Sequence, residues 1–112
     1  MSKIDIARER FTGQLEELRA KANQYDHAIN IRKMTIGELM EFIRSLKEIR
    51  KDLARKNKST KRIYELYKKF VEDYNMHVGV LMNLKRMLAD AREEAFLLEL
   101  LLKEGDAVER KV

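Results

Sequence analysis

Residues 63–102 read IYELYKKFVEDYNMHVGVLMNLKRMLADAREEAFLLELLL, and this stretch decides the fold. Apolar or aromatic residues recur in it at alternating steps of four and three, with a histidine among them. The line consists of Ile63, Tyr67, Phe70, Tyr74, His77, Leu81, Leu84, Leu88, Ala91, Ala95, Leu98 and Leu102. Side chains at this spacing share one side of a helix with about 3.5 residues per turn. The pattern therefore predicts one long helix over residues 60–104.

The composition of the chain limits the remaining choices. Its 112 residues include four Gly but no Pro and no Cys, and 38% of them are charged. A chain of this kind, rich in Leu, Lys, Glu and Arg, is typical of all-α proteins. We therefore expect a single all-helical domain over residues 1–112, with no disulfide bond and no thiolate metal site. The net charge of +5 allows an acidic partner without requiring one.

Two shorter helical segments are expected before the long helix, over residues 3–31 and 35–56. The first carries a narrow apolar stripe formed by Ile4, Phe11, Leu15, Leu18, Ala22, Tyr25 and Ile29. Gly13 interrupts this segment, either as a tolerated residue or as the mark of a close helix contact. The second segment has an apolar arc that is too wide for one neighbouring helix to cover.

The junction between these two segments carries opposing signals. Thr35 and Glu38 fit a capping box, and Met34 and Leu39 fit the hydrophobic staple that accompanies it, so that a helix is predicted to begin at Thr35. The apolar line nevertheless continues in phase across residues 30–36. Preserved phase favours a kink in a collinear path, although a chain reversal stays open. We therefore expect a first arm that is broken.

A chain reversal is predicted at residues 56–60. Asn57 can adopt the left-handed conformation that ends a helix, and Ser59 or Thr60 can cap the next one. The long helix then returns antiparallel to both upstream segments, which gives a coiled-coil-like helical hairpin. In that arrangement Gly37 and Gly79 are level, either by coincidence or because the two backbones cross closely there.

The end of the long helix is apolar around most of its circumference. Phe96, Leu97, Leu100 and Leu101 lie outside the apolar line, and a single partner helix cannot cover them. An exposed apolar patch of this size favours association. We expect these four residues to form an oligomer or partner interface, most simply in a dimer that pairs two hairpins into a helical bundle. The alternative is a three-helix monomer that buries the same faces.

The reversal lies in a strongly basic region. Residues 44–69 contain eleven basic and three acidic residues, a local net charge of +8, whereas residues 90–109 have a net charge of −5. The basic tip could contact nucleic-acid phosphates or an acidic protein, or could simply be solvated. Tyr64 and Tyr67 could stack on bases. The opposite charges also permit a head-to-tail contact between hairpins. The candidate phosphate contacts are Arg44, Lys47, Lys51, Arg55, Lys56, Lys58, Lys61 and Arg62.

The sequence contains no recognisable catalytic, cofactor or metal motif. His27 and His77 are far apart and belong to no metal-binding spacing. We expect His77 to be a core or edge histidine that bonds a side chain or water. No serine has a histidine nearby in sequence, and no glycine-rich phosphate loop occurs. We therefore expect a protein that is not an enzyme and that needs no cofactor.

The remaining expectations concern location, the tail and function. The start of the chain does not resemble a signal peptide, and nowhere do 18 apolar residues occur together, so a cytoplasmic protein without a membrane partner is expected. Gly105 should end the long helix, which leaves residues 106–112 as a frayed polar tail. The sequence as a whole predicts a non-enzymatic interaction, scaffold or adaptor module that self-associates. The alternative is a nucleic-acid-binding accessory protein that uses the basic tip.

Overall fold

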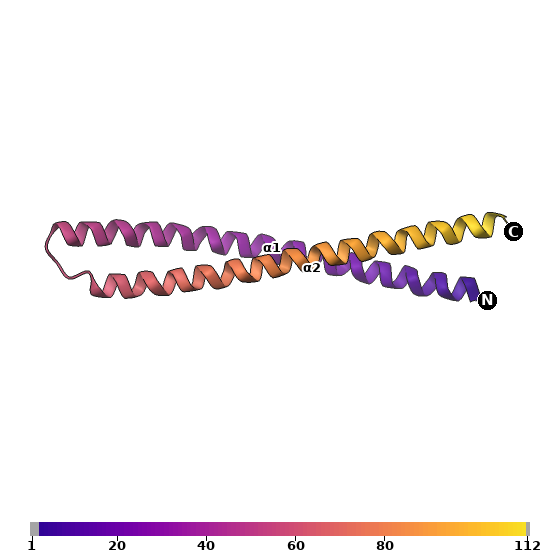
Figure 1. Cartoon of the computed structure of the whole chain (residues 1–112), viewed down its shortest axis with the longest axis horizontal. Coiled ribbons are helices and arrows are strands. Elements are labelled where there is room, and N and C mark those ends of the chain that lie inside the picture. Colours follow the sequence, from indigo (N-terminus) through magenta and orange to yellow (C-terminus); the bar gives the residue numbers. More distant parts are fainter. Residues whose placement is uncertain (1–2, 112) are drawn as a thin grey trace. The chain divides into compact units, whose positions relative to one another are not determined.

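Two long helices joined by a short turn make up the protein. In this computed structural model, helix α1 covers Lys3–Arg55 and helix α2 covers Lys61–Lys111 (Figure 1). The structure describes the backbone of residues 3–111, and the side chains of residue 3 and of residues 5–104. The predicted all-α helical hairpin is confirmed.

The contacts within the chain divide it into two units, each built from a segment of α1 and a segment of α2. The terminal unit consists of Met1–Ala28 and Leu84–Val112, and the turn unit consists of Ile29–Asn83. Each unit has its own seam between the two helical segments. The expectation of a single domain stays a prediction.

Helix α1 has no break, so the predicted division into segments 3–31 and 35–56 is wrong. Thr35 is not an N-cap. Its hydroxyl donates a hydrogen bond of 3.2 Å to the carbonyl oxygen of Ile31, as a threonine in the middle of a helix does. The apolar line of the first segment continues at the same spacing through the capping-box residues. Packing along this uninterrupted line stabilises a continuous helix more than the capping box stabilises a new helix start.

Helix α2 also extends further than expected. It continues through Gly105 to Lys111, so the predicted helix end at residue 104 is wrong. A single glycine inside a helix costs only about 1 kcal/mol relative to alanine, and no proline follows to stop the helix. The expectation that residues 106–112 form a frayed polar tail stays a prediction, since their side chains lie outside the described residues.

The reversal occurs where the sequence predicts it. Asn57 has a φ of 55°, in the left-handed region. The amide of Lys58 donates to the carbonyl of Leu53 at 2.9 Å, and the amide of Asn57 donates to that of Ala54 at 3.1 Å. These two bonds form a Schellman motif, in which Asn57 takes the position that glycine most often occupies. The predicted role of Asn57 is confirmed.

Helix α2 begins directly after the turn. The Thr60 carbonyl accepts the first helical hydrogen bond, from the Tyr64 amide at 3.0 Å. The Ser59 hydroxyl accepts a longer bond of 3.4 Å from the Lys61 amide. Thr60 therefore holds the N-cap position of α2, and the Ser59 side chain supports the first turn.

The predicted apolar lines form the seams. In α2, every member of the line from Ile63 to Leu102 is buried or half-buried, and in α1 the described members of the first stripe are as well. The core is nevertheless thin, because none of the described side chains is fully enclosed. The most buried residues, 5–8% exposed, are Leu15, Ile29, Leu46, Leu88 and Ala91.

The glycines within the helices mark no close helix contact. A Cβ atom added at Gly13, Gly37 or Gly79 would meet nothing within 4 Å. The proposed close crossing at Gly37 and Gly79 is therefore wrong, and their level positions are coincidental. Gly13 is a tolerated residue on an exposed part of α1.

Candidate interaction surfaces

Two interhelical ion pairs hold one side of the seam in the terminal unit. Arg19 donates from Nη2 to Oε1 of Glu99 at 2.7 Å, and Arg92 donates from Nη2 to Oδ2 of Asp26 at 3.1 Å. Both pairs are exposed, so each contributes at most about 1 kcal/mol. Their main effect is to favour one antiparallel register of α1 and α2 in this unit.

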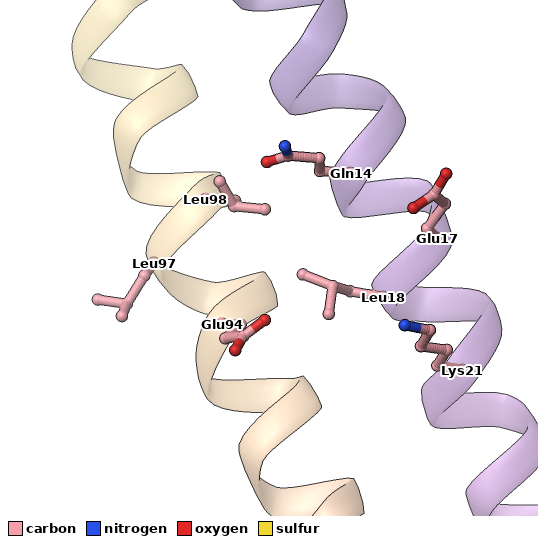
Figure 2. A pocket seen from close by; sticks show the side chains of 7 residues that line it. All are labelled: Gln14, Glu17, Leu18, Lys21, Glu94, Leu97 and Leu98. Atoms are coloured by element: carbon pink, nitrogen blue, oxygen red, sulfur yellow. The ribbon is translucent and has the colours of Figure 1, made fainter.

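An exposed apolar surface lies on α2 of the same unit. We call Phe96, Leu97, Leu100 and Leu101 the apolar strip, and their side chains are 58%, 51%, 43% and 52% exposed. Figure 2 shows that Leu97 points away from α1, whereas the neighbouring Leu98 points toward it. The strip therefore lies outside the seam, as the sequence predicts. Its role as an oligomer or partner interface stays a prediction.

A shallow groove runs between the helices beside the apolar strip. Its volume is about 490 Å³. Leu18 and Leu98 face each other across it, while Leu97 belongs both to the groove and to the strip (Figure 2). Polar or charged side chains form the rest of the lining: Gln14, Glu17, Lys21 and Glu94.

Acidic residues border the apolar strip on its own face of α2. Glu93 and Glu104 lie on one line with Leu97 and Leu100, at steps of four, three and four. Asp90 and Glu94 lie on a parallel line with Leu97 and Leu101 at the same steps. Residues at these spacings share a helix face. All four carboxylates are exposed, and the exposed Lys103 follows Phe96 and Leu100 on one line at steps of four and three. Acidic residues therefore predominate at the ends of the apolar strip.

The turn unit carries a contrasting surface. Lys47, Arg50, Lys51, Ala54 and Tyr67 line a groove of about 350 Å³, which we call the basic groove. Three of these five side chains are cationic, and the alanine methyl group and the tyrosine ring supply apolar surface between them. No acidic side chain belongs to the lining.

The predicted phosphate contacts do not form one cluster. Spacing places Arg44, Lys47, Lys51 and Arg55 on one face of α1. The others lie in the turn or in the first turn of α2: Lys56, Lys58, Lys61 and Arg62. All eight are exposed. Two of them form ion pairs within α1 or at its end, Lys51 with Glu48 at 3.5 Å and Lys56 with Asp52 at 3.0 Å. Nucleic-acid contact by these residues stays a prediction.

The tyrosines near the tip are engaged with cations of the chain itself. Arg50 and Lys68 each lie 4.8 Å from the centre of the Tyr64 ring, and Lys47 lies 5.9 Å from that of Tyr67. The two rings are stacked, with centroids 6.4 Å apart. Cation–π contacts of this kind use the ring faces that a stacked base would need. Sequence reasoning placed the tyrosines near the basic residues but did not predict these contacts.

A polar pair inside the turn-unit seam was also missed. Arg32 continues the apolar line of α1 between Ile29 and Ile36, and it contacts His77 of the α2 line. Nη1 of Arg32 lies 2.5 Å from Nδ1 of His77. Arginine can only donate, so Nδ1 of His77 is the acceptor in this hydrogen bond. The expectation that His77 bonds a side chain is confirmed. The sequence did contain a signal for this pair. A polar residue interrupts each of the two apolar lines, Arg32 in α1 and His77 in α2, and the hairpin brings these two positions together.

Metal binding and membrane insertion are two further classes of function. Among the described residues, no three His, Asp or Glu side chains are grouped closely enough to hold a metal ion. Over that part of the chain, neither helix has a stretch long and apolar enough to cross a membrane. Comparison of the chain with protein families, with curated proteins and with solved structures found no match.

Proposed function

We propose that this protein is a non-enzymatic interaction and scaffold module that associates with further copies of itself through the apolar strip. The observation that carries the proposal is the exposure of four neighbouring large apolar side chains in the terminal unit, each at least 43% exposed. Burying a Leu or Phe side chain is worth about 1.5–3 kcal/mol relative to leaving it exposed. Four such residues on one face give a second chain a substantial apolar contact.

The thin core supports the same proposal. Among the described residues only five are buried, and many large apolar side chains are exposed. The hairpin therefore leaves much of its apolar surface uncovered. Pairing hairpins into a helical bundle covers such surface in many helical proteins. A dimer is the simplest assembly of this kind. The cytoplasmic location and the absence of enzymatic activity expected from the sequence are parts of this proposal.

The experiment is a measurement of mass in solution for the Leu97→Glu, Leu101→Glu variant. We expect the parent protein to have the mass of a dimer or larger oligomer and the variant that of a monomer, because the contact loses two leucine side chains whose burial is worth about 1.5–3 kcal/mol each. The matched control is Met34→Glu, Met76→Glu, which places two carboxylates at apolar residues of the turn unit that are 69% and 56% exposed. The control should keep the parent mass.

Two results would contradict the proposal. One is a well-folded monomer for both the parent protein and the strip variant. The other is an equal loss of association in the strip variant and in the control, which would indicate that added negative charge acts nonspecifically. Helix content measured by circular dichroism separates either result from unfolding.

Nucleic-acid binding by the basic tip is the second candidate function. One observation favours it, namely that Arg44, Lys47, Lys51 and Arg55 share a face of α1. The contacts of Tyr64 and Tyr67 with chain cations weigh against base stacking at this place. We therefore rank it below self-association.

A further inference from the structure

We propose that the basic groove of the turn unit is the receptor for the apolar strip of a second copy of this chain. The proposal rests on the function proposed above and deepens it, because it names the surface on which the strip docks. The resulting contact is heterologous, with two different surfaces meeting. The charges at the borders of the two surfaces identify this occupant.

The apolar strip has the charge pattern of a ligand for a cationic surface. Its apolar centre is bordered by the exposed carboxylates of Asp90, Glu93 and Glu104. A receptor must therefore offer apolar surface at the centre and positive charge at the edges. Any surface with acidic edges would place like charges together, which opposes association.

The basic groove has the complementary pattern. Lys47, Arg50 and Lys51 line it together with Ala54 and Tyr67, which supply apolar surface. The stems of lysine and arginine add further apolar surface while their charged ends stay near water. The groove thus matches the strip in both respects, apolar against apolar and cation against carboxylate.

Two competing occupants fit less well. A strip docked on the strip of another copy would bring the carboxylates of both copies into one interface. A nucleic acid would find phosphate-binding cations in the groove, but the apolar surface of Ala54 and Tyr67 has no use in a phosphate contact. A second copy of the chain satisfies both features of the groove.

The contact allows assembly in two ways. Each chain has one strip and one groove, and a contact between two different surfaces can either close into a finite assembly or continue from copy to copy. In either case the association depends on both surfaces of the chain. It also weakens as salt screens the charges at the edges of the contact.

Charge reversal in the groove is the central test. We expect the Lys47→Glu, Lys51→Glu variant to lose the oligomer, with the main species shifting to the monomer mass. We expect association to return when Glu93→Lys and Glu104→Lys are added in the same chain, because the two surfaces are then complementary again with opposite signs. The matched control is Lys58→Glu, Lys69→Glu, which changes the net charge equally outside the groove lining and should keep the parent mass.

The outcomes separate this inference from the function on which it rests. If the groove variant keeps the parent mass while the Leu97→Glu, Leu101→Glu variant is monomeric, the chain self-associates through the strip but not on the groove, and the inference is wrong. If reversal in the groove removes association and the added lysines do not restore it, the inference is also wrong. If the strip variant still associates, the proposed function itself fails.

Two measurements on the parent protein complete the test without variants that could misfold. The oligomer should dissociate more readily at roughly 0.5 M salt than at roughly 0.05 M salt, and an assembly unaffected by salt would overturn the inference. A short DNA duplex at the lower salt serves as the competing probe. Duplex binding that depends on Lys47 and Lys51, in a chain whose mass does not depend on them, would assign the groove to nucleic acid instead.

Discussion

The terminal unit and the turn unit are built on the same apolar repeat but close their seams by different chemistry. In the terminal unit the ion pairs Arg19–Glu99 and Asp26–Arg92 flank buried Leu15, Leu88 and Ala91. In the turn unit the rings of Phe42 and Phe70 pack with centroids 5.7 Å apart, and Arg32 bonds His77 within the seam. The repeat alone therefore does not determine how a seam is completed.

The outer surfaces of the two units also differ in their chemistry. The terminal unit presents an apolar strip with mainly acidic ends, and the turn unit presents a groove lined by cations and apolar surface. The line positions at steps of four and three pack the helices in both units, so they leave little freedom for function. The residues outside the lines are free to differ. The proposed association would therefore use positions that the fold itself does not require.

The largest expected effect on stability concerns the buried leucines, which both seams share. Leu88 in the terminal unit and Leu46 in the turn unit are 7% and 8% exposed. Leu88→Ala and Leu46→Ala should each lower the free energy of unfolding by about 2–5 kcal/mol, as lost apolar burial and a cavity combine. Urea unfolding at one fixed protein concentration measures both losses.

A leucine outside the seams provides the matched control for these two variants. Leu66→Ala removes the same atoms at a residue that is 43% exposed, and its effect should be clearly smaller. If Leu46→Ala behaves like this control while Leu88→Ala does not, the two seams are not equivalent. The shared repeat would then stabilise only the terminal unit.

Sequence reasoning predicted the features that depend on regular spacing. The apolar lines and the reversal at Asn57 were predicted correctly, because each follows from helix geometry or from the backbone preference of one residue type. The break at Thr35 was wrong for a related reason. A capping box needs only a few residues, and the same residues occur inside helices, where packing along an uninterrupted line outweighs the local signal.

The chemistry of the surfaces was predicted only in part. The exposure of Phe96, Leu97, Leu100 and Leu101 followed from the width of the apolar arc. The pairing of Arg32 with His77 did not, because contacts across a hairpin depend on register and on side-chain reach, which one-dimensional spacing leaves open. The same holds for the cations on Tyr64, which come from both helices.

The second prediction concerns the polar pair that distinguishes the turn-unit seam. Arg32→Leu or His77→Leu alone should lower the free energy of unfolding by about 1–3 kcal/mol, because the half-buried partner loses its hydrogen bond. The double variant should lose less than the sum of the two single losses, because no unpaired polar group is left. A double-mutant cycle in urea measures this coupling. Additive losses would mean that the pair contributes nothing specific to the seam.

The smallest expected effect separates the flanks of the two seams by their response to salt. Glu99→Gln in the terminal unit removes the charge of an exposed ion pair, so it should cost at most about 1 kcal/mol at low salt. That cost should shrink at high salt, where the charges are screened. Phe42→Leu in the turn unit removes a ring contact with Phe70, which should cost about 0.5–1.5 kcal/mol. Because this contact involves no net charge, its cost should be the same at both salt concentrations. Equal salt dependence for the two variants would show that the ion pair and the ring contact stabilise their units by similar interactions. The two units would then differ in residue type but not in energetics.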